Sequence, residues 1–310
     1  MTQPYTTLKG VAHIGENTLS IQLEQSLATF FDWGLLNIGS FTNIGYTDSG
    51  TRLRPIEAHH YSKGEAWEGY RKNWVWETGL DYSYQPTHVT GIKVNGTFYS
   101  TGTTGTYAFD INYPFGQVVF DNPIPTTSVV EVAYSYKYYF IGDTNTPWFT
   151  EFMYNSFQTN DDTFFQYGSG LRAIFSENSV QLPAVIVDVT PSRKTTGKML
   201  GGGKYVSIGT QFHVFAETPW DYKRVMDIIV GQEEKKIYGL DFNVIRDSGV
   251  SPLTGAGFLA PSSLNYKELI EIYPWKSIRF MNMNGYEVDS ISSLYCGVIR
   301  CECEVDCPEL

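Results

Sequence analysis

One segment in the second half of the chain constrains the fold more than any other. Residues 182–189 form a nearly continuous apolar run, and residues 205–216 alternate between apolar and polar side chains, so both stretches predict β-strands. Thr218 follows as a helix N-cap, with Pro219 at the first helical position, which is a strong start signal. Because a further helix is expected at 148–157, the region predicts an α+β core in which helices cover one face of a sheet.

Residues 87–141 predict an antiparallel β-rich unit inserted before this core. Asn95-Gly96 is a strong signal for a two-residue hairpin turn, and it directly follows the apolar strand expected at 89–94. Further strands are expected at 107–112, 117–120 and 129–141. Since Gly-, Thr- or Pro-rich turns separate them, the unit is expected to be a small sandwich-like structure.

The N-terminal region combines one clear helix with an irregular stretch. Apolar side chains recur at helical spacing from Leu19 to Phe31. Asn17 is the expected N-cap, and Gly34 suits the C-terminal end. Residues 35–85 are rich in Gly, Thr, Ser, Asn and aromatic residues without sustained periodicity. They predict either an extended arm on a neighbouring subunit or a long loop folded over its own domain.

The predicted organisation has three parts. They are the N-terminal helix and extended arm at 1–86, the antiparallel β unit at 87–146, and the α+β core at 147–310. The core includes a Pro- and Gly-rich loop at 251–261, followed by strands expected at 269–273, 277–282 and 295–305.

Charge and aromatic content narrow the possible function classes. The chain is 15% aromatic and 18% charged, whereas about 25% charge is usual and protein–protein interfaces combine aromatic enrichment with charge depletion. The net charge of −11 argues against binding duplex nucleic acid or an anionic membrane, although DNA passing along an acidic wall is compatible with it. No apolar run of 18 residues and no Sec-type signal is visible, so no membrane partner is expected.

No motif predicts catalysis, a cofactor or a metal site. All four cysteines lie near the C-terminus: Cys296, Cys301, Cys303 and Cys307. Their spacing differs from paired zinc knuckles, so structural thiols are favoured over a metal site or disulfides, with Cys301 and Cys303 on one face of a strand. The stretch 198–204 fails the P-loop pattern. The acidic pairs Asp161-Asp162 and Glu233-Glu234 are more typical of solvated turns than of paired catalytic carboxylates.

Two groups of residues are candidates for contacts with other subunits. The first group is aromatic: Trp67, Tyr70, Trp74 and Trp76. Half-exposed rings at this spacing favour packing on a neighbour, with burial in the chain's own core and a glycan-stacking platform as alternatives. The second group is a basic, Gly-rich loop: Arg193, Lys194, Lys198 and Lys204. The loop predicts either a projection into an assembly or an ordinary hairpin tip.

The order of elements at 182–245 resembles the tail-terminator and neck proteins of tailed bacteriophages. The resemblance rests on the apolar strand at 183–189, the glycine-containing loop, the second strand at 207–216 and the capped helix at 219–230. In that family an α+β subunit forms a ring, six-fold in symmetry, at the joint between head and tail. The N-terminal arm and the β unit are additions to the simple terminator subunit.

The resemblance implies a non-enzymatic structural protein of the virion, assembled in the host cytoplasm. Its partners would be further copies of itself and other head, neck, tail-tube or sheath proteins, and DNA would pass through the lumen without sequence-specific binding. A baseplate or other tail component is the alternative within this class. A glycan-binding receptor-recognition protein is the alternative from another class.

Overall fold

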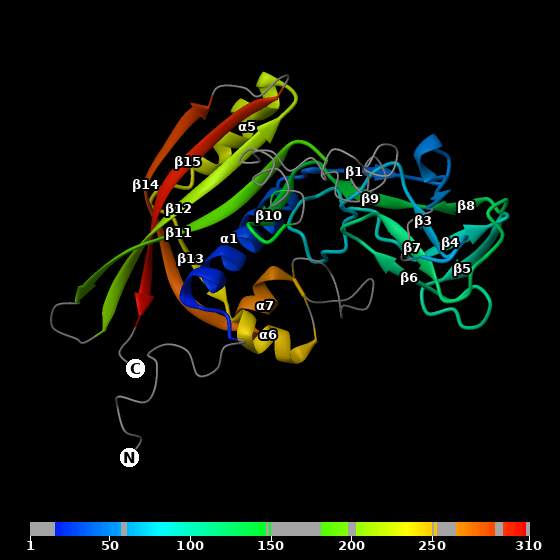
Figure 1. Ribbon diagram of the computed structural model, residues 1–310, viewed down its shortest axis with the longest axis horizontal. Coiled ribbons are helices and arrows are strands. Elements are labelled where there is room, and N and C mark those ends of the chain that lie inside the picture. Colours follow the sequence, from blue (N-terminus) through cyan, green and yellow to red (C-terminus); the bar gives the residue numbers. More distant parts are fainter. Residues whose placement is uncertain are drawn as a thin grey trace, which may run out of the picture.

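The computed structural model of the chain describes residues 16–56, 61–146, 149, 181–197, 203–249, 251–252, 265–288 and 294–307. This part of the chain has a mixed α+β fold, as the sequence predicts, with four α-helices. The molecule is elongated, with a curled six-stranded sheet at one end of its long axis and small antiparallel sheets at the other (Figure 1). We call these two ends the sheet half and the β-rich half.

The sheet half is built on strands in the order β10-β11-β12-β15-β14-β13. Their bounds are Phe140–Asp143 (β10), Ala184–Gly197 (β11), Lys204–Ala216 (β12), Tyr295–Cys307 (β15), Pro274–Val288 (β14) and Lys236–Leu240 (β13). β10 and β11 are parallel, and the other neighbours are antiparallel. The predicted strands at 205–216, 277–282 and 295–305 are confirmed. β11 is longer than predicted because it resumes pairing with β12 after a register shift between Val189 and Arg193.

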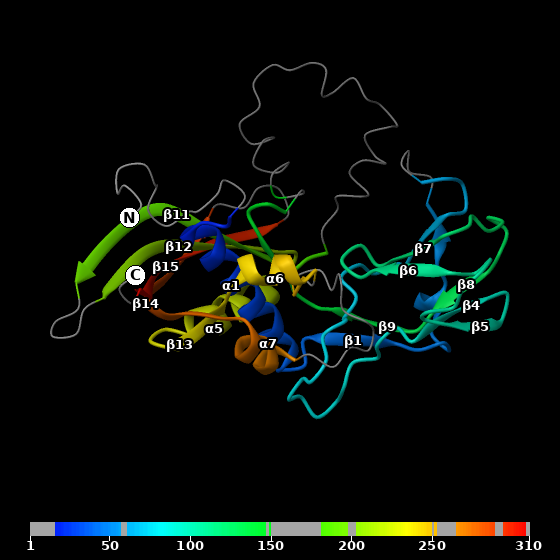
Figure 2. The ribbon, with the colours of Figure 1, turned by 90° about the horizontal axis from the view of Figure 1, so that it is seen from below.

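Helices α1 (Leu19–Leu36) and α5 (Pro219–Val230) cover the same face of this sheet (Figure 2). The cover by α5 was expected, whereas α1 was assigned to the N-terminal part of the chain. Alternate residues of β12, including Ile208 and Phe212, point into the core between sheet and helices, where they meet Val225 of α5. The period-2 pattern of the strand and the 3.6-residue pattern of the helix therefore bury their apolar sides against each other. We call this apolar cluster the first core.

Helix α5 begins as predicted, whereas a third predicted C-terminal strand is a helix. The Thr218 side chain accepts a hydrogen bond from the backbone N–H of Asp221 at 3.1 Å. Residues 269–273, expected as a strand, lie largely in helix α7 (Tyr266–Ile272). The prediction was wrong because Asn265 and Glu268 form a capping box, in which each side chain accepts the backbone N–H of the other and favours a helix start.

Helix α1 continues past the end predicted for it. Gly34 lies inside the helix, and the chain turns only at Gly39, which has a φ of +83°. Leu35 and Leu36 are buried in two different apolar clusters, and burying two leucines outweighs the roughly 1 kcal/mol that glycine costs within a helix.

The β-rich half contains three small antiparallel sheets. One comprises β2 (Arg54–Pro55), β3 (Ala66–Glu68), β7 (Gln117–Phe120) and β6 (Phe109–Asn112); another comprises β5 (Thr97–Ser100), β4 (Gly91–Val94) and β8 (Val130–Val132); in the third, β1 (Phe41–Ile44) pairs with β9 (Tyr134–Lys137). A short 3-10 helix spans Ser49–Thr51. The predicted Asn95-Gly96 turn is confirmed, with φ values of +51° and +84°.

The run predicted as one strand at 129–141 instead supplies three. β8 pairs with β4, β9 pairs with β1, and β10 pairs with β11 of the large sheet. The alternation of apolar residues correctly predicts extended strand within each part of the run, but it does not reveal that the partner strand changes twice. This run therefore passes from the β-rich half into the sheet half (Figure 1).

The described residues of the predicted N-terminal arm fold onto their own chain. Helix α1 is in the first core, while β1, β2 and β3 belong to the small sheets. The apolar cluster of the β-rich half, which we call the second core, contains Leu53, Trp74 and Leu80, and it extends to Trp33 of α1. The extended-arm interpretation is thus wrong for these residues, because their large side chains fill this second core. Helix α1 packs in both cores, with Leu27 in the first and Leu36 in the second.

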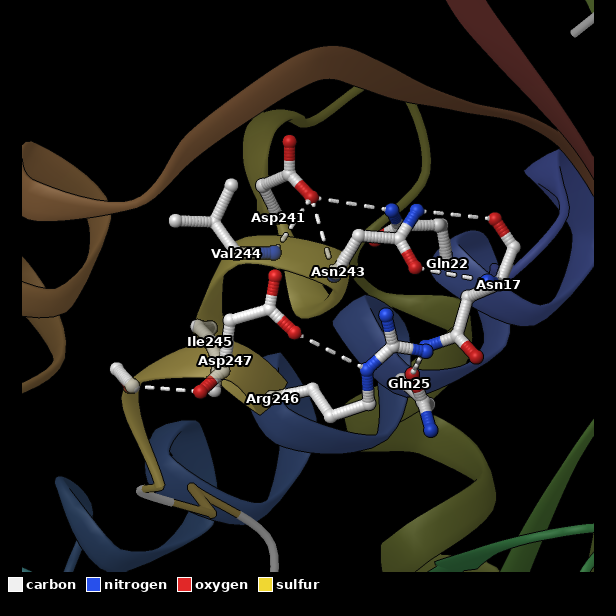
Figure 3. A network of polar contacts seen from close by, with 10 residues as sticks. Asn17, Gln22, Gln25, Asp241, Asn243, Val244, Ile245, Arg246 and Asp247 are labelled. Atoms are coloured by element: carbon white, nitrogen blue, oxygen red, sulfur yellow. Dashed lines mark hydrogen bonds and ion pairs between the residues drawn. The ribbon is translucent and has the colours of Figure 1, made fainter. Parts of the chain in front are cut away.

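A polar network fixes the start of α1 against helix α6 (Phe242–Ser248) (Figure 3). Asn17 does not cap α1; its backbone N–H donates to Asn243 Oδ1 at 2.7 Å, and the Asn243 amide donates back to the Asn17 carbonyl at 3.2 Å. Gln22 accepts from the Phe242 backbone N–H at 2.9 Å and donates to Asp241 at 3.2 Å. The Gln22 side chain thereby satisfies the Phe242 N–H, one of the N–H groups in the first turn of α6 that have no partner within the helix. The Asn17–Asn243 pair holds the segment before α1 against α6.

Candidate interaction surfaces

Three of the four predicted aromatic contact residues are buried. Trp67, Trp74 and Trp76 lie in the second core, so the prediction that they are half exposed is wrong. The Trp74 ring stacks on Tyr134 with centroids 4.5 Å apart, and its indole N–H donates to the Arg71 carbonyl at 2.7 Å. The small sheets have strands of only two to four residues, and large rings supply the buried area that such short strands lack.

Tyr70 is the member of this group that stays on the surface, with 79% of its side chain exposed. It borders an open hollow of about 360 Å³ lined by Ser49, Gly50, Arg52, Arg54, Glu68 and Tyr70. Within the hollow, the Arg54 guanidinium contacts Glu68 Oε1 through two nitrogens at 2.6 and 2.8 Å. The hollow therefore presents a ring beside a pre-formed ion pair.

The predicted basic group lies on the β11–β12 hairpin, at the opposite end of the molecule from strand β3 (Figure 1). Arg193, Lys194 and Lys204 are exposed, while Lys198 lies outside the described residues. The Arg193 guanidinium donates to the Ser20 hydroxyl of α1 at 2.5 Å. Much of the predicted loop is strand, so three of these basic side chains stand on a paired hairpin.

Sequence reasoning missed a surface at the end of α1, which we call the Tyr84 patch. Tyr84 is 63% exposed and Ile38 is 54% exposed. The ring of Phe41 lies parallel to that of Tyr84, with centroids 6.3 Å apart, and meets Tyr82 edge to face at 6.1 Å. Three aromatic rings and an isoleucine thus gather at the surface, a combination typical of interface cores.

A second missed surface, the Trp220 patch, lies at the start of α5. Trp220 is 74% exposed, and a helical projection of α5 places it off the buried stripe that contains Val225 and Ile229. Nearby, the Tyr138 hydroxyl donates to Asp221 Oδ1 at 2.9 Å. Burial, together with this bond, raises the pKa of Tyr138 to about 12, so the phenol keeps its proton. Tyr295, which packs on Tyr222 of α5, adds a third exposed ring.

The cysteines lie along β15, and no disulfide joins them. Cys301 and Cys303 face the first core, with their sulfur atoms 3.9 Å apart, which confirms that they share one face of a strand. Among the residues that the structure describes, no group of three or more His, Cys, Asp or Glu side chains is placed to hold a metal ion.

Of the two acidic pairs found in the sequence, Glu233-Glu234 lies in the described part of the structure. Glu234 follows α5 in a turn, where it pairs with Arg279 on the surface, and Glu233 accepts a backbone N–H from Met283 at 3.4 Å. The Asp161-Asp162 pair and the helix predicted at 148–157, apart from Phe149, lie outside the described residues.

By its fold the chain is a mixed α+β protein with two large apolar cores, a smaller apolar cluster around Ile186 and Phe215, and exposed aromatic patches on both halves in the part that the structure describes. Compared with known proteins, the sequence matches no protein family, and no curated protein is significantly similar to it. None of the helices in the described ranges combines the length and the apolar character needed to cross a membrane.

Proposed function

We propose that this chain is a non-enzymatic structural subunit of a tailed-phage virion, forming a ring at the neck or tail terminus. The single observation that carries the proposal is the exposure of Trp220, and of Tyr84 beside the rings of Phe41 and Tyr82, in a chain poor in charge. Such groups of exposed rings are the usual centres of protein–protein contacts.

The position of the two patches fits a head-to-tail contact between copies. The Trp220 patch belongs to the sheet half. The Tyr84 patch combines residues that follow α1, begin β1 and lie between β3 and β4, so the two surfaces differ in sequence. A contact between unlike surfaces generates a closed ring when the rotation from each copy to the next brings the last copy into contact with the first. The β11-β12-α5 order supports the terminator resemblance, and the six-fold symmetry comes from that resemblance alone.

The test is the mass of the purified full-length chain, measured by analytical ultracentrifugation and by negative-stain imaging. We expect discrete rings, with about 1,600 Å² or more buried at each contact. Trp220→Ala and Tyr84→Ala should each weaken assembly at least tenfold, since central aromatic hot spots contribute about 2 kcal/mol or more. Phe98→Ala, at an exposed ring outside both patches, is the matched control. A chain that stays monomeric at every concentration contradicts the proposal.

A glycan-binding role is the second candidate, and the hollow beside Tyr70 is the observation that favours it. A ring next to the Arg54–Glu68 pair offers stacking and hydrogen bonds of the kind that sugars need. Binding of host polysaccharide by a small oligomer, lost in Tyr70→Ala, would support this role instead of the ring.

A further inference from the structure

Three charged side chains meet in the interior where the two halves join. Lys137 Nζ lies 2.5 Å from Asp32 Oδ2 and 2.5 Å from Glu77 Oε1. Asp32 comes from α1, Lys137 from β9, and Glu77 from the segment after β3, so each belongs to a different part of the fold. All three side chains are buried, with Glu77 completely inaccessible. We call this group the seam cluster.

The cluster contains one more acid than base. Two other titratable side chains face it in the described part of the chain. The His88 ring donates from Nε2 to the Glu77 backbone carbonyl at 2.7 Å. Burial, aided by the Glu77 charge, raises the pKa of Tyr113 to about 12, so that phenol is neutral. With every acid ionised, the interior would hold an excess negative charge, which is costly in a low-dielectric site.

We propose that the seam cluster is a proton-operated lock between the two halves of the molecule. In the closed state Asp32 keeps a proton, so one carboxylic acid, one carboxylate and one ammonium leave the interior neutral. When the proton leaves at higher pH, the added charge weakens the contact of α1 with β9 and with the Glu77 segment. This inference does not depend on the proposed function.

The electrostatics of the site support the lock. Burial is the largest influence on Asp32; Lys137 opposes it and Glu77 reinforces it, and together they raise the pKa of Asp32 from 3.8 to about 7. Burial alone would lower the pKa of Lys137, but the two acids outweigh it and raise that pKa, so the ammonium stays charged. Asp32 is thus the group that gains or loses the proton near neutral pH.

The direction of the pH effect follows from proton linkage. Between the unfolded pKa of 3.8 and the folded pKa of about 7, the native state holds a proton that the unfolded state has lost. Stability from this group is complete below the lower value and is lost as pH rises through the upper one. One proton per molecule changes the unfolding equilibrium constant by up to about tenfold per pH unit in this window.

The decisive experiment is urea unfolding of the full chain between pH 5 and 9, comparing the wild type with Asp32→Asn. We expect the wild-type unfolding constant to rise between pH 5 and 7 and to level off above 7, while Asp32→Asn lacks this rise. His88→Gln should keep the wild-type slope, and so should Asp81→Asn, at an exposed aspartate paired with Lys267. An Asp32→Asn variant with the wild-type slope, or a His88→Gln variant without it, would overturn the lock.

A measurement on the wild type keeps the proposal testable even if Asp32→Asn does not fold. Infrared spectroscopy distinguishes a protonated carboxylic acid from a carboxylate, and we expect one buried carboxylic acid at pH 6 that disappears by pH 9. The protection factors of the amides at residues 134–137, corrected for the intrinsic rise of hydrogen exchange with pH, should fall over the same range. A spectrum without the carboxylic acid band at pH 6 would refute the proposal.

Discussion

Trp33 of α1 meets Trp76 edge to face, with ring centroids 5.7 Å apart and planes at 84°. Each tryptophan is next to an acid of the seam cluster in the sequence: Trp33 follows Asp32, and Trp76 precedes Glu77. Both rings are buried in the second core, yet α1 also contributes Leu27 to the first core. The ring pair and the seam cluster together join the two halves.

Replacing Trp33 with alanine should therefore destabilise the whole molecule. We expect a loss of about 3–5 kcal/mol in the free energy of unfolding, because removing a buried indole leaves a large cavity. The measurement is urea unfolding followed by circular dichroism, with Phe98→Ala as control, since that ring is exposed, lies outside both patches and should cost less than about 0.5 kcal/mol. Equal losses in the two variants would contradict the assignment of Trp33 to the core.

Gly64 should be the least replaceable glycine of the β-rich half. It has a φ of +84°, and a methyl group there would overlap the carbonyl oxygen of Ile124. Gly64→Ala is expected to cost roughly 2–5 kcal/mol, combining left-handed strain with displacement of backbone. Gly102 has a similar φ of +86° and open space around it, so Gly102→Ala should cost only about 1–2 kcal/mol. Thermal unfolding of the two variants measures the cost of the contact with Ile124, because both variants share the left-handed strain. Equal Tm values for the two variants would show that this contact costs nothing.

Thr218→Ala tests the start of α5. The side chain accepts the Asp221 N–H at 3.1 Å and bonds the Asp221 carboxylate at 2.7 Å, so losing this cap should cost about 1 kcal/mol. Thr218→Ser retains the hydroxyl and should behave nearly as the wild type in the same chemical denaturation. If serine is as destabilising as alanine, the effect comes from the methyl group and not from the cap.

The thiols of β15 should react unequally in the folded chain. The bond to Cys301 and then burial raise the pKa of Cys303 well above its usual value, so its reactive thiolate is scarce. Cys307 is only partly buried. Ellman's reagent should label Cys307 first and Cys303 only after unfolding, and Cys307→Ser should remove the fast phase. Rapid labelling that persists in this variant would show that a buried thiol is accessible.

The sequence predicts individual elements of this fold better than it predicts their partners. The Asn95-Gly96 turn and the Thr218 cap are set by local backbone chemistry, and both are found where expected. The division of residues 129–141 among three sheets depends on strands that are distant in sequence, which alternation alone does not specify.

The candidate surfaces, too, are predictable where a local pattern decides exposure and unpredictable where distant contacts decide it. Trp74 and Trp220 are both tryptophans in polar surroundings, yet one is buried and the other is exposed. The helical periodicity of α5 contains the signal that places Trp220 outside the buried stripe, although that signal was not used in predicting the surfaces. The segment that contains Trp74 has no regular period, so its burial is decided by contacts with residues such as Tyr134, more than fifty positions away.

The passage of residues 130–143 through three sheets has a mechanical consequence. Since one continuous backbone contributes β8, β9 and β10 in turn, a pull between the two ends of the molecule is borne by covalent bonds along this run. Drawing the ends apart requires stripping β9 from β1 or β10 from β11. Strand pairing along this run therefore resists separation of the two ends, in addition to the side-chain contacts between them.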